Sequence, residues 1–365
     1  MKYERISLIV GARPNFVKAA PLLEALKKQG GFNLRLIHTG QHFDAEMSKV
    51  FFEQLKMPEP DLYLGINQGS PVEQIAGVMV ALEEEFIRNN DELVIVFGDV
   101  NSTLAASLSA SKLHIPIAHV EAGLRSFDRT MPEEHNRVAT DHLADYLFTP
   151  SPDADKNLRN EGVGEEKIYR VGNIMVDSLL RFAPLARESH VLDEFQLGPQ
   201  GYGLVTLHRP ANVDQRAALE EILGALVEIG SRIPLLFPVH PRTRQKLQQW
   251  GWAVRLEASR VRLTQPLGYL EFLKLMMQAR LILTDSGGIQ EESSVLGTPC
   301  ITVRDNTERP ITISEGTNTL AGTSRIGVLT AFKEVMSQAM PEAAKIDLWD
   351  GRAGERIARI LAELE

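Results

Sequence analysis

The sequence is poor in cysteine and in long apolar runs, and each scarcity excludes a class of protein. Cys300 is the only cysteine in 365 residues, which excludes an internal disulfide and a cysteine-rich zinc site. No apolar run approaches the roughly 20 residues with which a helix crosses a bilayer. The run at residues 6–10 is too short for the hydrophobic part of a signal peptide. We therefore expect a cytoplasmic protein without a membrane partner.

Basic residues are outnumbered by acidic ones. The 39 lysines and arginines face 48 aspartates and glutamates, and the net charge of −9 argues against a nucleic-acid-binding protein. Local basic pockets for anionic ligands remain compatible with this charge. Hydrophobic residues make up 44% and charged residues 24% of the chain, which is typical of a globular rather than a disordered protein. The length suffices for two domains, each with its own core.

Short apolar runs alternate with helical patterns almost from end to end, and this alternation starts twice. Helical patterns, such as the one at residues 71–89, separate the runs. Continuous apolar strands separated by helices indicate a parallel sheet covered on both faces. We expect an α/β fold of two Rossmann-like, doubly wound domains that face one another and bind ligands at their strand ends. The runs lie at 6–10, 34–40, 93–99, 115–123 and 146–151, and again at 203–210, 234–240, 261–267, 279–288 and 298–305.

Both halves begin with a strand that is followed by a basic residue, a proline and a helix. The first contains Arg13 and Pro14, and the second contains Arg209 and Pro210. An arginine beside a helix N-terminus opposes the helix dipole unless an anion lies between them. Arg13 and Lys18 are therefore candidates for binding a phosphate or diphosphate. The alternative is a pair of surface cations that bind no ligand.

A second candidate for anion binding lies in the other half. Ser286, Gly287 and Gly288 follow an apolar strand and open a helix, where small residues let a phosphate approach the free backbone amides. Glu291 and Glu292 lie one turn further on, where a carboxylate can accept hydrogen bonds from a ribose diol. The alternative is a tight helix start without a ligand.

Three carboxylates lie at or after strand ends in the first half, at Asp99, Glu121 and Glu133. A carboxylate directly after a buried strand is unfavourable unless it is paired, hydrogen-bonded or protonated, and such sites can supply acids and bases. The alternative makes Asp99 a helix N-cap, and Glu133 and Glu134 first-turn acids that favour the dipole. For Glu121 this alternative fails, because Gly123 follows and no helix begins there.

Two histidines, His208 and His240, end apolar strands in the second half, and each has an arginine nearby. His42 and His119 also lie near strand ends, without a further argument of their own. No histidine pair has the spacing of a helical zinc site, so we expect no metal. No Gly-X-Ser-X-Gly motif supports a serine hydrolase, and Cys300, within an apolar strand, is expected in the core.

Ten motifs taken together resemble the non-hydrolysing UDP-N-acetylglucosamine 2-epimerase family. The resemblance implies the glycosyltransferase type B fold with its active site in the inter-domain cleft, and a homodimer. The implied division is an N-terminal domain at 1–172 with the acid/base carboxylates, a UDP-binding domain at 173–350, and a terminal helix at 351–365 that packs back on the N-terminal domain. The motifs are GARPNFVKAAPL (11–22), HTGQHFD (38–44), FGDVNSTLA (97–105), HVEAGLRS (119–126), MPEEHNR (131–137), VGN (171–173), TLHRPANVD (206–214), PVHPRTR (238–244), LTDSGGIQEE (283–292) and RDNTERP (304–310).

The resemblance also implies a role for each matching residue. Asp99, Glu121 and Glu133 match the family's acid/base carboxylates, and His208 matches its catalytic-site histidine beside the diphosphate. The residues expected to hold the substrate or its UDP moiety are Arg13, Lys18, His240, Ser286, Gly287, Gly288, Glu292 and Arg309.

The implied reaction converts UDP-N-acetylglucosamine to UDP-N-acetylmannosamine by elimination and re-addition of UDP through 2-acetamidoglucal, supplying precursors for surface polysaccharide without a metal or redox cofactor. Three motifs also resemble the branch that acts on UDP-2,3-diacetamido-2,3-dideoxyglucuronate, which is the alternative substrate.

Ala12, Asp44 and Pro210 depart from relatives activated by UDP-N-acetylglucosamine, so we expect weak activation or none. Less favoured alternatives are a hydrolysing epimerase that releases N-acetylmannosamine and UDP, a glycosyltransferase, and a non-catalytic nucleotide-sugar sensor.

Overall fold

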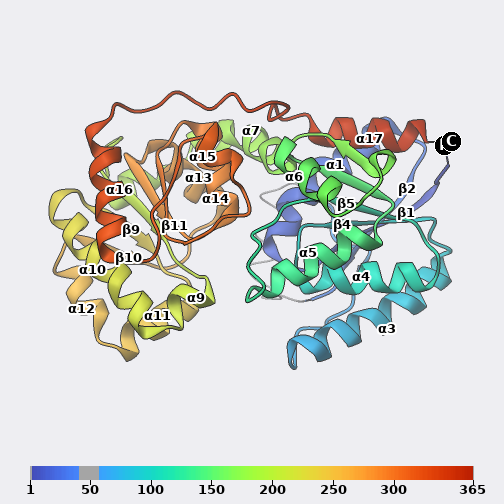
Figure 1. Ribbon diagram of the computed structural model, residues 1–365, viewed down its shortest axis with the longest axis horizontal. Helices are drawn as coiled ribbons and strands as arrows, with labels where there is room; N and C mark the ends of the chain where they lie inside the picture. The colour runs from blue at the N-terminus through green and yellow to red at the C-terminus, as the bar shows by residue number, and fades with distance from the viewer. Residues whose placement is uncertain (1, 41–56, 365) are drawn as a thin grey trace. The chain divides into compact units, whose positions relative to one another are not determined.

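The chain folds into two compact units, each built around one parallel sheet (Figure 1). Unit 1 comprises Met1–Arg181 and Asp347–Glu365, and unit 2 comprises Phe182–Ile346. The structure is a computed structural model that describes residues 2–40 and 57–364, apart from the side chain of Arg13. Within those residues, no helix is long and apolar enough to cross a membrane.

Unit 1 contains a seven-stranded sheet in the order β3-β2-β1-β4-β5-β6-β7. The chain moves outward from β1 in one direction and then from β4 in the other, so the strand order reverses between β1 and β4. In doubly wound sheets this switch point is where ligands bind, beyond the C-terminal ends of the strands. The strands are β1 (Arg5–Val10), β2 (Asn33–His38), β3 (Leu62–Tyr63), β4 (Leu93–Phe97), β5 (Ile117–Val120), β6 (Tyr146–Thr149) and β7 (Ile168–Arg170).

Helices cover both faces of this sheet, which is why its central strands are apolar along their whole length. Helices α3, α4 and α5 lie on one face and α1 and α17 on the other (Figure 1). The helices of unit 1 are α1 (Arg13–Gln29), α3 (Pro71–Asn89), α4 (Asn101–Lys112), α5 (Pro132–Leu143), α6 (Pro152–Asn160), the 3-10 turn η1 (Glu165–Lys167), the first part of α7 (Ile174–Arg187), and α17 (Ala353–Glu363).

The C-terminal segment of the chain packs on unit 1. The carboxylate of Asp177 accepts hydrogen bonds from the backbone amides of Ala353 (3.0 Å) and Gly354 (2.7 Å), which are the first residues of α17. The indole of Trp349 donates to the carbonyl of Pro150 at 2.9 Å. These bonds satisfy the free amides of the helix start and bind the start of α17 to α7, and α17 packs along α1.

Unit 2 contains a six-stranded sheet in the order β10-β9-β8-β11-β12-β13, with its switch point between β8 and β11. Helices α10 and α16 pack on one face, and α13 and α14 lie together on the other. The strands are β8 (Gly203–Thr206), β9 (Leu235–Pro238), β10 (Val261–Thr264), β11 (Leu281–Thr284), β12 (Cys300–Thr302) and β13 (Asn318–Leu320). The helices are α8 (Val191–Phe195), α9 (Pro210–Val213), α10 (Arg216–Arg232), α11 (Pro241–Gln249), α12 (Trp252–Glu257), α13 (Tyr269–Gln278), α14 (Gly287–Leu296), α15 (Ile311–Ser314) and α16 (Arg325–Ser337).

Two parallel sheets with helices on their faces confirm the predicted α/β fold of two doubly wound units. The sequence set the end of the first domain at residue 172, whereas the compact unit extends to Arg181, inside α7. The hydroxyl of Ser178 donates to the carbonyl of Val17, so this part of α7 is bound to α1.

Candidate active site at the strand ends

A buried ion pair lies at the switch point of unit 1. Lys18, in the second turn of α1, pairs with Glu121, which follows β5, and their side chains are only 8% and 5% exposed. The backbone of Glu121 has φ 75°, in the left-handed region that non-glycine residues rarely adopt. Its amide donates to the carbonyl of Phe148 at 3.1 Å, which holds it there. Strain of this kind at a strand end is typical of functional sites.

Gly98, between β4 and Asp99, closes over this ion pair. Its φ is +60°, and a Cβ added there would lie 2.8 Å from Nζ of Lys18 and 2.9 Å from Oε2 of Glu121. Real Cβ atoms do not approach other atoms so closely. The turn after β4 therefore requires glycine for two independent reasons, its conformation and its contact with the ion pair.

Asp99 is held by Arg137, which ends the motif at residues 131–137 but was not among the predicted site residues. Arg137 of α5 pairs with Asp99 and with Glu134. The side-chain amide of Asn136 donates to the Asp99 carbonyl at 2.9 Å. The N-cap of α4 is Val100, so Asp99 does not cap that helix. Its side chain is 28% exposed, which leaves it accessible to a ligand.

The two adjacent glutamates of α5, Glu133 and Glu134, differ in their burial and in their hydrogen bonds. Glu134 is buried and accepts hydrogen bonds from the amides of Ser126 (3.0 Å) and Phe127 (2.8 Å). Burial by itself would raise the pKa of Glu134, but these amides and Arg137 hold it below its usual value. Glu133 is half-buried, and we find no hydrogen bond or ion pair for it within the described chain. The spacing of Glu134 and Arg137, three residues apart on one helix, is the signal that could have separated the two.

His208 and a buried aspartate form the corresponding pair in unit 2. Nδ1 of His208 lies 2.9 Å from Oδ1 of Asp285, which follows β11 and is completely buried. The aspartate also accepts from the amides of His208 (3.1 Å) and Arg209 (3.0 Å). Burial by itself would raise the pKa of Asp285, but His208 and these amides lower it. Asp285 therefore stays ionised and orients the imidazole, whose side chain is 46% exposed.

Sequence reasoning missed Asp285. It follows an apolar strand directly, which is the argument that singled out Asp99. His240 lies near His208, with 6.4 Å between the ring centroids. Its Nδ1 accepts from the amide of Arg242 at 3.3 Å, so the ring caps α11.

The start of α14 lies against a cluster of arginines. Ser286 is the N-cap of α14, and its side chain makes no capping hydrogen bond. A Cβ at Gly287 would lie 2.3 Å from Nη1 of Arg309, so only glycine allows this contact. Within this turn, Oε1 of Glu291 lies 2.9 Å from Nε of Arg309, and Glu292 accepts from the hydroxyl of Tyr269 at 3.1 Å.

Three arginines gather around one buried glutamate in this cluster. Glu308, 2% exposed, lies 2.9 Å from Arg209, 2.8 Å from Arg304 and 2.6 Å from Arg309. Burial lowers the pKa of Arg304, which is the unfavourable effect that a bound anion would relieve. The start of α14 beside these arginines is therefore suited to an anionic ligand.

Two predicted features lie outside the described part of the chain. Arg13 begins α1, but its side chain is not described. Asp44, with the rest of residues 41–56, is likewise not described. In the described residues, no group of three or more histidine, cysteine, aspartate or glutamate side chains could hold a metal ion.

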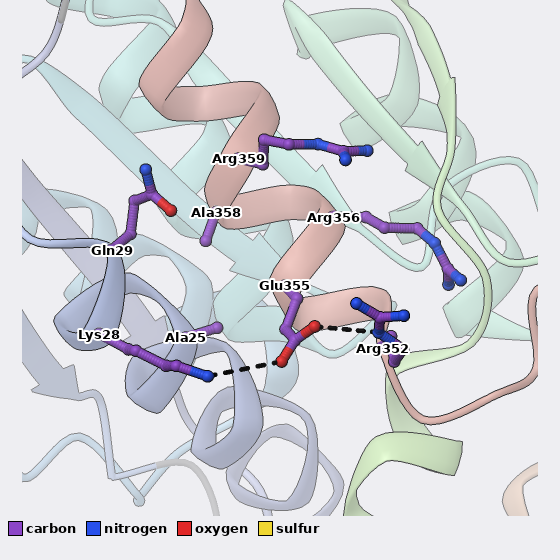
Figure 2. A pocket seen from close by; sticks show the side chains of 8 residues that line it. All are labelled: Ala25, Lys28, Gln29, Arg352, Glu355, Arg356, Ala358 and Arg359. Carbon is purple, nitrogen blue, oxygen red and sulfur yellow. Dashed lines mark hydrogen bonds and ion pairs between the residues drawn. The ribbon is translucent and has the colours of Figure 1, made fainter.

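A groove of about 440 Å³ lies elsewhere on unit 1, between the last turn of α1 and α17 (Figure 2). Glu355 lies 3.9 Å from Nζ of Lys28 and 3.0 Å from Nε of Arg352. A helix of 17 residues is about 25 Å long, and the predicted residues of α1 lie near its start. The groove is therefore remote from the strand-end site. Its lining residues are Ala25, Lys28, Gln29, Arg352, Glu355, Arg356, Ala358 and Arg359.

Comparison with known proteins identifies the family of the chain. The model of the UDP-N-acetylglucosamine 2-epimerase family matches residues 24–362. The UDP-N-acetylglucosamine 2-epimerase of Methanocaldococcus jannaschii is 42% identical over 98% of both chains. The UDP-2,3-diacetamido-2,3-dideoxy-D-glucuronate 2-epimerase of Pseudomonas aeruginosa is 41% identical over 99% of this chain and 100% of that protein.

Two solved structures are similar over nearly the whole chain. The Methanocaldococcus jannaschii enzyme in complex with UDP-GlcNAc and UDP has a TM-score of 0.91, covering 98% of this chain and 99% of that one. The Neisseria meningitidis enzyme bound to UDP-GlcNAc also has a TM-score of 0.91, at 28% identity, covering 99% and 100% of the two chains. The chain belongs to the UDP-N-acetylglucosamine 2-epimerase family.

Proposed function

We propose that the protein interconverts UDP-N-acetylglucosamine and UDP-N-acetylmannosamine by epimerisation at C2 of the sugar. The observation that carries the proposal is the pairing of two strand-end carboxylates with buried cations in unit 1, together with the arginine cluster at the start of α14 in unit 2. Membership of the family supports the same reaction.

The chemistry explains why such groups are needed. The hydrogen at C2 is not adjacent to a carbonyl, so its direct removal near neutral pH is prohibitively slow. Breaking the bond between C1 and the UDP oxygen first develops positive charge at C1, which acidifies that hydrogen. The reaction thus proceeds by loss of UDP and of the C2 proton to give 2-acetamidoglucal. UDP then adds back as C2 is protonated on the opposite face.

Unit 2 would stabilise the departing UDP. Arg309 and the amides at the start of α14 would bind the diphosphate as its charge develops, with Ser286, Gly287 and Gly288 allowing close approach. Glu292 would accept hydrogen bonds from the ribose. His208, oriented by Asp285, and His240 would contact the diphosphate. The reaction requires no metal and no redox cofactor.

Unit 1 would carry out the proton transfers. Asp99 and Glu121 would act on opposite faces of the sugar, each transfer contributing roughly 10²- to 10⁴-fold to the rate. The ammonium group of Lys18 stabilises the ionised form of Glu121, which is the form that accepts a proton. Glu133 is the third carboxylate of the proposed set, and Arg13 and Lys18 would contact the substrate from α1.

The diacetamido-uronate sugar is the second candidate substrate, favoured by the similarity to the Pseudomonas aeruginosa enzyme. Its carboxylate would need a cation in addition to those that bind the diphosphate. Incubation of the purified protein with each UDP-sugar, followed by NMR of the products, distinguishes the candidates. We expect UDP-N-acetylmannosamine from UDP-N-acetylglucosamine. Turnover of the uronate alone would favour the alternative, and free N-acetylmannosamine with UDP would indicate a hydrolysing enzyme.

We further propose that the protein acts as a cytoplasmic homodimer and requires no UDP-N-acetylglucosamine as activator. Helix α3 carries exposed apolar side chains on one face, with Val72, Val80 and Ile87 exposed by 73%, 61% and 60%. Their burial against a second copy would favour association. Sedimentation velocity measures the assembly. Kinetics from UDP-N-acetylmannosamine, with and without added UDP-N-acetylglucosamine, measure the activation.

A further inference from the structure

A buried network behind the strand ends of unit 1 connects the turns that carry Asp99 and Glu121. His119, on β5, is completely buried; its Nδ1 lies 2.6 Å from Oδ1 of Asp141 and its Nε2 lies 2.8 Å from the carbonyl of Gly98. Asp141, on α5, is 1% exposed. Its other oxygen accepts from the amide of Gly123 at 3.0 Å.

The two turns held in this way are those of the proposed acid/base groups. Gly98 immediately precedes Asp99, and Gly123 lies two residues after Glu121. The amide of Gly98 also donates to the carbonyl of Val120 at 3.0 Å. The amide and the carbonyl of Gly98 are therefore both bound to residues of β5. Gly98 and Glu121 both have positive φ, at 60° and 75°. Such conformations persist only where surrounding bonds determine them.

Both ring nitrogens of His119 face acceptors, one a carboxylate and the other a carbonyl. Each nitrogen must then donate a proton, so the geometry describes an imidazolium. Burial by itself would raise the pKa of Asp141, but His119 and Arg125 lower it. Arg125 donates to Asp141 at 2.7 Å and to both oxygens of Glu161 at 2.7 Å.

Opposite charges are paired in this network. His119 and Arg125 are opposed by Asp141, which is buried with them, and by Glu161, whose side chain is 26% exposed. A buried ion pair is tolerated only when it is compensated in this way. His142 lies next to the network, with its Nε2 3.2 Å from Glu161.

We propose that His119 and Asp141 are positioning residues that hold the Asp99 and Glu121 turns in the geometry required for proton transfer. The proposal rests on the proposed function, since it assigns these two turns to the proton-transfer groups. Loss of either residue releases the Gly98 carbonyl or the Gly123 amide without removing a group that touches substrate.

Single and double variants test this proposal. In His119→Gln the side-chain amide can donate to Gly98, but its oxygen then faces the Asp141 carboxylate. In Asp141→Asn the side-chain oxygen can still accept from Gly123, and the amide nitrogen can donate to Nδ1 of a neutral ring whose Nε2 still donates to Gly98. This variant therefore keeps both turns bound. In the double variant the glutamine amide donates to Gly98, the glutamine oxygen accepts from the asparagine amide, and the asparagine oxygen accepts from Gly123. Arg125 stays paired with Glu161.

We expect His119→Gln to lower kcat by about 10- to 100-fold, the scale of a small misplacement of catalytic groups, with UDP affinity and KM little changed, and Asp141→Asn to lower kcat much less. The double variant should recover most of this loss. Asp155→Asn is the matched control, because Asp155 is 4% exposed on α6 and bonds to Thr149 rather than to either turn. It should lower thermal stability and leave kcat unchanged.

A wild-type kcat for His119→Gln in an active enzyme would overturn the positioning role, as would a control that loses as much turnover as His119→Gln does. If the wild-type protein itself lacked epimerase activity, the proposed function would fail instead. Nitrogen-15 NMR of His119 provides a readout that needs no turnover. Two protonated ring nitrogens are expected from the two acceptors that they face, and a ring nitrogen without a proton would contradict the proposed pair.

Discussion

The contact between Gly98 and the Lys18–Glu121 ion pair gives the sharpest prediction from unit 1. In Gly98→Ala, the added Cβ meets Lys18 Nζ at 2.8 Å and Glu121 Oε2 at 2.9 Å, so the ion pair must shift. The positive φ of 60° costs about 1–2 kcal/mol for a residue with a Cβ. For a unit of this size, this corresponds to a fall of about 2–4 °C in Tm per kcal/mol.

The effect on activity should be much larger than the effect on stability. A misplacement of a catalytic group by about 1 Å can cost about 10²-fold in rate, and we expect a loss of that size in kcat for Gly98→Ala. The matched control is Gly162→Ala in the same unit. Gly162 has φ +83°, and nothing lies within 4 Å of a Cβ placed there. The control should therefore show the same strain without disturbing the ion pair.

Thermal unfolding and steady-state kinetics of both variants separate the two effects. We expect similar losses of Tm and a loss of turnover in Gly98→Ala alone. Equal activity of the two variants would refute the argument that the ion pair beneath Gly98 must keep its position.

Three further predictions concern single buried groups. Asp285→Asn removes the carboxylate that orients the His208 ring and accepts from the amides of His208 and Arg209. Turnover should fall by about 10²-fold or more. Wild-type kinetics in this variant would contradict an orienting role for Asp285. Burial raises the pKa of Cys300 to about 12, so its thiol should resist iodoacetamide until the protein is unfolded, as mass spectrometry can measure. Burial raises the pKa of Asp177 from 3.8 to about 6, above its unfolded value, so its contribution to stability grows as the pH falls through 6 and is full below about 4. The Tm difference between wild type and Asp177→Asn should therefore shift in favour of wild type from pH 7 to pH 5, and a constant difference would contradict it.

Local signals were sufficient for most elements of the fold, although the short strands β3 and β13 were not predicted. The helical pattern at residues 71–89 corresponds to α3, because Ser70 and Glu73 form a capping box around Pro71 and Asn90 ends the helix in a left-handed conformation. The buried strands β4 and β11 follow from their unbroken apolar runs. Each of these features depends on neighbours in the sequence.

The contacts of the candidate site depend on residues far apart in the sequence, and these were harder to predict. Asp99 and Glu121 could be singled out because each follows a buried strand. Their ion pairs could not, since Arg137 and Lys18 meet them only after the sheet has formed. Lys18 itself was predicted, but as a phosphate-binding residue. Asp285 was within reach of the strand-end argument and was missed. Its burial beside His208 became evident only from the tertiary contacts.

The central claim is that the C2 proton is exchanged by enzyme carboxylates during elimination and re-addition of UDP. Incubation with UDP-N-acetylglucosamine in D2O, followed by proton NMR and mass spectrometry of both epimers, tests it most directly. The account predicts deuterium at C2 of both epimers and none at C4, because the proton returned to C2 comes from a group in exchange with solvent. Epimerisation with full retention of the original C2 hydrogen would contradict it.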